Sequence, residues 1–179
     1  MKIPYTVKKS RRARAMRVSV YPDGAVVVTV PSGREGSTSV IRSFVEKCRS
    51  WILGQIRQTA GRVPIYVNKA DIPMLKKRAL ALASARSAHF AAIYGVSHGT
   101  ITIRAQKSRW GSCSHKGDLS FNYKMAALPP HLADYVVVHE ICHLLALDHS
   151  KRFWDLVERT IPDHRALRKE LRSIIFLFR

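Results

Sequence analysis

One stretch of the chain limits its fold and chemistry more than any other, namely the segment from His139 to His149, H-E-I-C-H-L-L-A-L-D-H. Its first five residues fit the pattern H-E-x-x-H. On an α-helix, residues four positions apart share a face, with Cβ atoms about 5–6 Å apart. His139 and His143 can therefore bind one ion together, and the pattern predicts a helix that carries a metal site.

The other ligands and the general base are expected close to this helix. Glu140 follows the first histidine and is predicted to lie beside the metal, where a zinc hydrolase places its base. A catalytic zinc needs three protein ligands and an open fourth position. His149 is the predicted third ligand if the helix ends near 146–148, because on a continued helix it would lie roughly 240° around from His143. Glu158 is the alternative third ligand, since His and Glu both suit zinc.

The charge of the chain is high and uneven. The sequence has 31 Lys and Arg against 12 Asp and Glu, a net charge of +19. Residues 1–110 hold 21 basic and 4 acidic residues, whereas residues 111–179 hold 10 and 8. The positive charge therefore lies mainly in the N-terminal half, most densely in residues 8–17. Such a field attracts an anionic partner such as nucleic acid; a basic surface without a dedicated partner is the alternative.

Cysteine number and hydropathy indicate the compartment. The three cysteines are an odd number without the spacing of a disulfide framework, which suits a reducing environment. No apolar run approaches the length of a membrane span, and the first residues lack the apolar region of a signal peptide. We expect a cytoplasmic monomer that does not enter a membrane. The length of 179 residues suits one domain over residues 1–179, and the apolar fraction of 46% is ordinary for a globular protein.

The pattern of apolar residues and turn residues predicts an α+β fold. Residues 1–31 are predicted to form a β-meander, because the β-rich runs 18–21 and 25–30 flank the turn Pro22-Asp23-Gly24. Apolar spacing favours helices farther along, and Gly95 is a candidate helix C-cap. The helices are predicted at 38–59, 73–94, 131–145, 151–160 and 165–174, and further strands at 100–104 and 118–123.

Several separated motifs occur in the order found in the YgjP-like family of metal-dependent hydrolases, which this chain resembles. They are R-W-G-S-C at 109–113, G-D-L-S-F-N at 117–122, Y-V-V-V-H-E-I-C-H at 135–143 and D-H-S-K-R-F-W at 148–154. The resemblance is close over residues 100–175, the predicted metal-site core, and looser over 1–99.

The resemblance implies a zincin-like fold related to metallopeptidases and SprT-like proteins. It implies Zn²⁺ as the cofactor, with His139, His143 and His149 as metal ligands and Glu140 as the catalytic acid and base. Peptides are the substrate usually inferred for this motif, and hydrolysis of nucleoside triphosphates, notably UTP, is attached to some relatives.

Two further polar residues are candidates for substrate contact. Arg109 can pair with an oxyanion or phosphate, and Asn122 can orient a carbonyl or phosphate. Asn122 lies in the predicted strand 118–123, which we expect to be the edge strand that pairs with extended substrate. The structural alternatives are an ion pair for Arg109 with a nearby acid and backbone hydrogen bonds for Asn122.

Together these observations predict a zinc-dependent hydrolase, in which Glu140 takes the proton of a zinc-activated water. A metallopeptidase that acts on a peptide or protein is the first hypothesis, and a UTP pyrophosphatase is the second. A hypothesis of another class is a basic nucleic-acid-binding module with a structural zinc. The presence of Glu140 disfavours the nucleic-acid-binding module, because a closed structural zinc site needs no general base.

Overall fold

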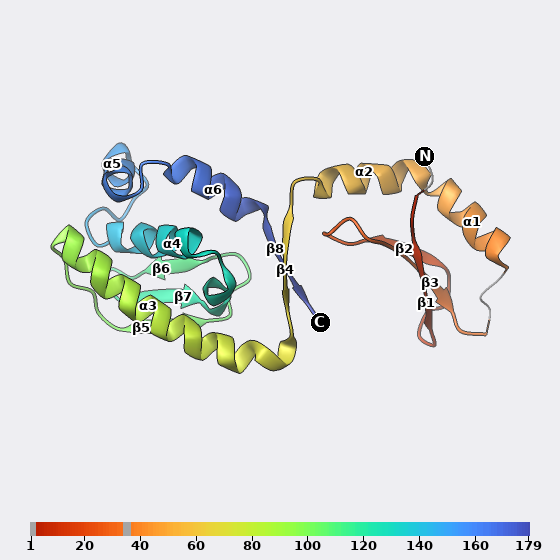
Figure 1. Ribbon diagram of the computed structural model, residues 1–179, viewed down its shortest axis with the longest axis horizontal. Coiled ribbons are helices and arrows are strands. Elements are labelled where there is room, and N and C mark those ends of the chain that lie inside the picture. The colour runs from red at the N-terminus through yellow and green to blue at the C-terminus, as the bar shows by residue number, and fades with distance from the viewer. Residues whose placement is uncertain (1–2, 34–36) are drawn as a thin grey trace. The chain divides into compact units, whose positions relative to one another are not determined.

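The computed structural model describes residues 3–33 and 37–179 (Figure 1). It divides into two compact units. The N-terminal unit comprises Met1–Pro64 and Ser173–Ile175, and the C-terminal unit comprises Ile65–Arg172 and Phe176–Arg179. The single domain that we expect over residues 1–179 stays a prediction.

The sheet of the N-terminal unit contains strands β1 (Thr6–Ser10), β2 (Arg17–Val20) and β3 (Val26–Pro31) in the order β1-β3-β2. Strand β3 is parallel to β1 and antiparallel to β2. The three strands follow the β-rich sequence, but the predicted β-meander is wrong, because β3 lies between the other two. The first two residues of the range 1–31 lie outside the described residues.

The burial of each strand explains this order. Val26, Val28 and Val30 of β3 are buried, which suits a central strand, whereas β1 is almost wholly exposed and carries Lys8 and Lys9. Lysines are typical of edge strands, where they discourage pairing with another chain. The most apolar strand thus takes the centre of the sheet.

Two helices complete the core of the N-terminal unit. Helix α1 (Thr38–Lys47) and helix α2 (Arg49–Thr59) replace the single helix predicted over 38–59, with a break at Cys48. The break allows apolar side chains of both helices to join one hydrophobic cluster with β3. The buried members of this cluster are Ile3, Val26, Val28, Val30, Ile41, Val45 and Ile52.

The sheet of the C-terminal unit contains β5 (Ile101–Arg104), β6 (Gly111–Cys113) and β7 (Leu119–Asn122) in the order β5-β7-β6. Strand β7 is parallel to β5 and antiparallel to β6, and all four of its residues are buried. The prediction that strand 118–123 is an edge strand is therefore wrong. Two of its four residues, Ser120 and Asn122, are polar but buried, and β5 and β6 form the two edges of this sheet instead.

Two long helices pack against this sheet. Helix α3 (Ile72–Tyr94) contacts β5, helix α4 (Pro130–Cys142) contacts β6, and the two helices contact each other (Figure 1). Gly95 caps α3 with a φ of 66°, which confirms the predicted C-cap. Arg86 of α3 and Asp134 of α4 form a bidentate ion pair at 2.6 and 2.8 Å. This pair fixes the helix that was predicted to carry the metal site.

The remaining elements are shorter. Helices α5 (Lys151–Thr160) and α6 (His164–Ser173) agree with prediction to within one residue. Strands β4 (Val63–Val67) and β8 (Ile174–Phe178) pair with each other and were not predicted; the boundary between the two units passes through both. Within the described residues, no helix is both long and apolar enough to cross a lipid bilayer.

Candidate metal centre

Helix α4 stops early enough for the chain to fold back. It ends at Cys142, a few residues before the expected end near 146–148. Tight turns follow, in which the N–H of Leu144 donates to Ile141 O and the N–H of Ala146 donates to Cys142 O, both at 3.0 Å. His149 then immediately precedes Ser150, the N-cap of α5.

The fold brings the three predicted ligand histidines together. One ring nitrogen of each of His139, His143 and His149 lies within 4.8 Å of the others. The Nε2 atoms of His139 and His149 are 3.1 Å apart. His139 and His143 are half-buried, whereas His149 is exposed, so the cluster opens toward solvent on the His149 side.

The spacing and proton positions of these rings suit a metal ion. Two nitrogens bound tetrahedrally to one zinc at about 2.0–2.1 Å lie about 3.3 Å apart, close to the observed Nε2–Nε2 distance. The Nδ1 of His143 lies 3.0 Å from Ala146 O. A proton on Nδ1 satisfies that carbonyl and leaves the Nε2 of His143 with a free lone pair, as in other histidine ligands.

Burial keeps the inner histidines neutral. It lowers the pKa of His139 to about 3, with the neighbouring His143 and His149 adding to the effect. Burial also lowers the pKa of His143. Neutral imidazole is the form that binds a metal. The donor set, its spacing and its protonation therefore fit a zinc ion.

One aromatic ring packs against all three imidazoles. Phe153 of α5 is fully buried, and its ring centroid lies 4.4 Å from that of His143, 4.8 Å from His149 and 4.9 Å from His139. This shared contact limits the rotation of each ring.

Glu140 lies beside the cluster and outside it. Its residue is only 4% exposed, and burial raises the pKa of its carboxyl to about 8, while Arg109 acts in the opposite direction. A Cβ placed on Gly111 of β6 would lie 2.6 Å from Glu140 Oε1. Glycine at that position thus leaves room for the carboxylate against the edge strand, a contact that the motif alone did not reveal.

A cavity of about 280 Å³ opens at His139 and Glu140. Of the two predicted substrate contacts, Arg109 lines this cavity and Asn122 does not. Asn122 is buried, and its Nδ2 donates to Gln106 O at 2.7 Å and to Arg109 O at 3.0 Å. The hydrogen bonds of Asn122 hold the loop that carries Arg109, which matches the structural alternative for Asn122.

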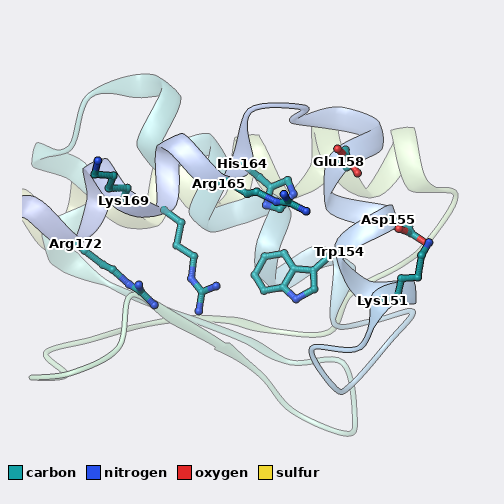
Figure 2. Close-up of a pocket in the computed structure, with 9 residues that line it drawn as sticks. Lys151, Trp154, Asp155, Glu158, His164, Arg165, Lys169 and Arg172 are labelled. Atoms are coloured by element: carbon teal, nitrogen blue, oxygen red, sulfur yellow. The ribbon is translucent and has the colours of Figure 1, made fainter.

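Glu158, the alternative third ligand, lies away from the histidine cluster. Glu158 lines a second cavity of about 650 Å³ between α5 and α6 (Figure 2), and it is not part of the histidine cluster. Arg168 and Arg172 of α6 line both cavities. Sequence reasoning missed these two arginines, although their spacing of four on a predicted helix was a usable signal.

The fold and the site define an α+β protein with a histidine cluster suited to one metal ion. The chain belongs to the YgjP-like family, whose model, described as YgjP-like, metallopeptidase domain, matches residues 63–174. The match confirms the resemblance, and the helices and strands of the structure confirm the expected α+β class. Membership in a metallopeptidase family also implies a metal ion.

Two solved structures are similar to the chain. The metallopeptidase zymogen abylysin of Pyrococcus abyssi is 24% identical, with a TM-score of 0.48, over 51% of this chain and 92% of that one. The metallopeptidase zymogen jannalysin of Methanocaldococcus jannaschii is 14% identical, with a TM-score of 0.46, over 51% of this chain and 94% of that one. No curated protein matches the sequence.

Proposed function

We propose that the protein is a zinc-dependent peptidase in which His139, His143 and His149 hold the ion and Glu140 transfers the proton. The observation that carries this proposal is the convergence of three imidazoles beside a buried carboxyl that lines a cavity. A structural zinc needs neither the cavity nor the carboxyl. The site therefore favours catalysis over a structural zinc in a nucleic-acid-binding module.

Zinc, when bound, supplies Lewis-acid activation of water and of the carbonyl that is attacked. Glu140 accepts a proton from the water on its carboxylate and returns it to the nitrogen of the leaving amine. A carboxyl group held beside the ligands can serve in both halves of this transfer. Gly111 keeps the backbone of β6 close enough to hold Glu140 in place.

Strand β6 is the element that we propose to align an extended substrate. Among the described strands it pairs only with β7, which leaves its other edge unpaired. Gly111 of β6 lines the cavity together with His139 and Glu140. Addition of a peptide strand to an exposed sheet edge is a common mode of recognition. A peptide strand added to the free edge of β6 would place a peptide bond beside the carboxyl group of Glu140.

Hydrolysis of a nucleoside triphosphate is the second candidate function, because Arg109, Arg168 and Arg172 line the cavity. These arginines can bind phosphate as well as carboxylate. This function is less favoured, because one zinc and three exposed arginines would have to neutralise all the negative charge of a triphosphate. We place the peptidase first because the family is defined by a metallopeptidase domain.

Two measurements test the proposed function. The first is zinc content, which should be about one ion per chain and should fall sharply in His149→Ala but stay normal in Glu158→Ala. Full zinc retention in His149→Ala with loss in Glu158→Ala would refute the ligand set.

The second measurement compares cleavage of an unfolded protein with release of pyrophosphate from UTP. Glu140→Gln should keep zinc and lose roughly 10²–10⁴-fold in peptide turnover, the usual share of a general base. UTP turnover that depends on Glu140, without any proteolysis, would replace the peptidase by the nucleotide hydrolase.

A further inference from the structure

Helix α6 has a basic face, defined here as Arg165, Arg168, Lys169 and Arg172. Their spacing of three and four places the four side chains on one side of the helix, opposite the buried Leu167 and Leu171. In the described part of the chain, none of the four forms an ion pair with an acid. The only acid of the helix, Glu170, lies 3.0 Å from the Nε2 of His131. The positive charge of this face is therefore available to a ligand.

This basic face borders both cavities of the C-terminal unit. In the cavity at His139, every charged lining residue except Glu140 is an arginine. The larger cavity has five basic residues against Asp155 and Glu158, and Asp155 is already 2.8 Å from the Nζ of Lys151. Figure 2 shows the two acids on α5 and Lys169 and Arg172 on α6. The α6 side of both cavities thus favours an anion.

Arg168 is held in place close to the histidine cluster. Its guanidinium lies 5.2 Å from the ring centroid of Trp154, which stacks on the buried His164 at 5.2 Å and 15°. The ring of Trp154 in turn lies 5.7 Å from that of His149. A guanidinium that stacks on an aromatic face keeps its N–H groups free for a carboxylate. Arg168 is therefore an oriented donor beside the proposed metal site.

We propose that Arg168 and Arg172 form an anion-binding subsite that selects peptides with an Asp or Glu side chain near the bond to be cleaved. The proposal rests on the peptidase function argued above and adds its substrate class. An extended chain that passes from the first cavity to the second meets both arginines, because both cavities share them. Two guanidinium forks match the planar carboxylates of such a chain.

Binding, measured apart from cleavage, tests this subsite. The full-length, zinc-loaded Glu140→Gln variant is titrated into two fluorescent peptides that differ only in Glu or Gln on both sides of the central bond. We expect the Glu peptide to bind about 10-fold more tightly, the size expected of a charge-assisted hydrogen bond. Adding Arg168→Gln and Arg172→Gln should bring this ratio close to one. Arg168→Glu with Arg172→Glu should favour a peptide with Lys at the same positions.

Arg152→Gln provides the matched control, because Arg152 lies on α5 and lines neither cavity. It should leave the Glu-to-Gln ratio unchanged. Equal binding of the two peptides by the protein with both arginines would overturn the proposal, and so would the same loss of preference in Arg152→Gln. A nucleoside triphosphate that needs Arg168 and Arg172 to bind, while both peptides bind alike, would assign the arginines to phosphate instead.

Cleavage of the Gln peptide by wild-type protein separates this proposal from the proposed function. Cleavage that requires Glu140, together with a binding ratio of one, supports the peptidase and refutes the subsite. A high binding ratio that depends on the two arginines, without cleavage of any peptide, supports the subsite and refutes the peptidase.

Discussion

The two units of the molecule differ in whether their ionisable groups are buried. Residues 1–64, which form most of the N-terminal unit, hold 13 basic and 3 acidic residues, and the densest group surrounds an open cavity of about 560 Å³ lined by Arg12, Arg14 and Arg17. The C-terminal unit instead buries Glu140 and encloses two neutral histidines. In the first unit the charged groups are exposed, whereas the second unit adds, to exposed residues such as those of the basic face of α6, a few ionisable groups that are buried at fixed positions.

This difference separates two kinds of recognition. Exposed charge attracts any anion and weakens with salt, because counterions screen it. A buried carboxyl between Gly111 and His139 acts on one atom of one substrate, and its effect depends on position to within about an ångström. We therefore expect the N-terminal unit to tolerate changes that the C-terminal unit does not.

The largest effect that we expect is from metal removal. Zinc at about 1,000 times its dissociation constant should stabilise the unit that binds it by about 4 kcal/mol. Hydrogen exchange measured by mass spectrometry, with and without a chelator, should show this loss in residues 130–160 and little change in residues 17–52. Equal loss in both segments would mean that the units unfold together, as the single-domain prediction requires.

The next effect compares two glycines. Gly111→Ala would place a Cβ 2.6 Å from Glu140 Oε1, whereas a Cβ on Gly54 of α2 would meet nothing within 4 Å. We expect Gly111→Ala to lower kcat by about 100-fold at unchanged zinc content, because the carboxyl is displaced. Gly54→Ala should leave kcat unchanged and stabilise the fold by about 0.5–1 kcal/mol. Similar kinetics of the two variants would show that the contact with Gly111 does not position Glu140.

A smaller effect tests the basic N-terminal unit. We propose that residues 8–17 bind an anionic partner, and single-stranded nucleic acid is the probe. Glu at Arg11, Arg12 and Arg14 should weaken binding about 10-fold at low salt, because fewer phosphates are neutralised. The slope of log K against log salt should fall by about one for each arginine that pairs with a phosphate. Peptide turnover should not change.

The same reversal at residues 76–78 of α3, which are three consecutive basic residues, is the matched control. An equal loss of nucleic-acid binding in both triple variants would show that total charge acts, and no local site. Binding that does not change with salt would exclude charge as its main cause.

The smallest effect concerns pH and Asp118 in the C-terminal unit. Its Oδ1 accepts hydrogen bonds from the backbone N–H of Thr100 at 2.8 Å and from its hydroxyl at 2.7 Å, and these bonds lower the pKa of the carboxyl. A lowered pKa in the folded state stabilises the fold above the unfolded value of about 3.9, and this stabilisation is lost as pH falls through the lower, folded value.

The melting temperature of metal-free protein should therefore fall more steeply below pH 4 in wild type than in Asp118→Asn. Identical pH profiles of the two proteins would show that these hydrogen bonds do not favour the ionised form of Asp118.

The sequence was most informative where chemistry depends on local spacing. The interval of four between His139 and His143, and the need for a turn before His149, follow from helix geometry alone. The exact end of α4 at Cys142 did not follow, because helix ends depend on what the next residues contact. In this chain the residues after Cys142 form tight turns, and Phe153 then packs against the three imidazoles.

The sequence was least informative about strand neighbours and distant contacts. Strand β7 alternates like a half-exposed strand, but it pairs with β5 and β6 on its two sides, and Ser120 and Asn122 are buried. The place of β3 between β1 and β2 depends on competition among strands for the core, which no local pattern encodes. Gly111 and Arg168 reach the site only through the tertiary fold.

The contact of Phe153 with all three imidazoles has a consequence for protein engineering. The proposed ligands and their common support occupy a single continuous segment, residues 139–153, so a designer can transplant them as one piece with its turn. We expect that exchanging one ligand alone would also disturb the other two, because all three imidazoles pack against the same Phe153 ring. Retuning the centre for another metal would therefore require simultaneous redesign of the histidines and Phe153.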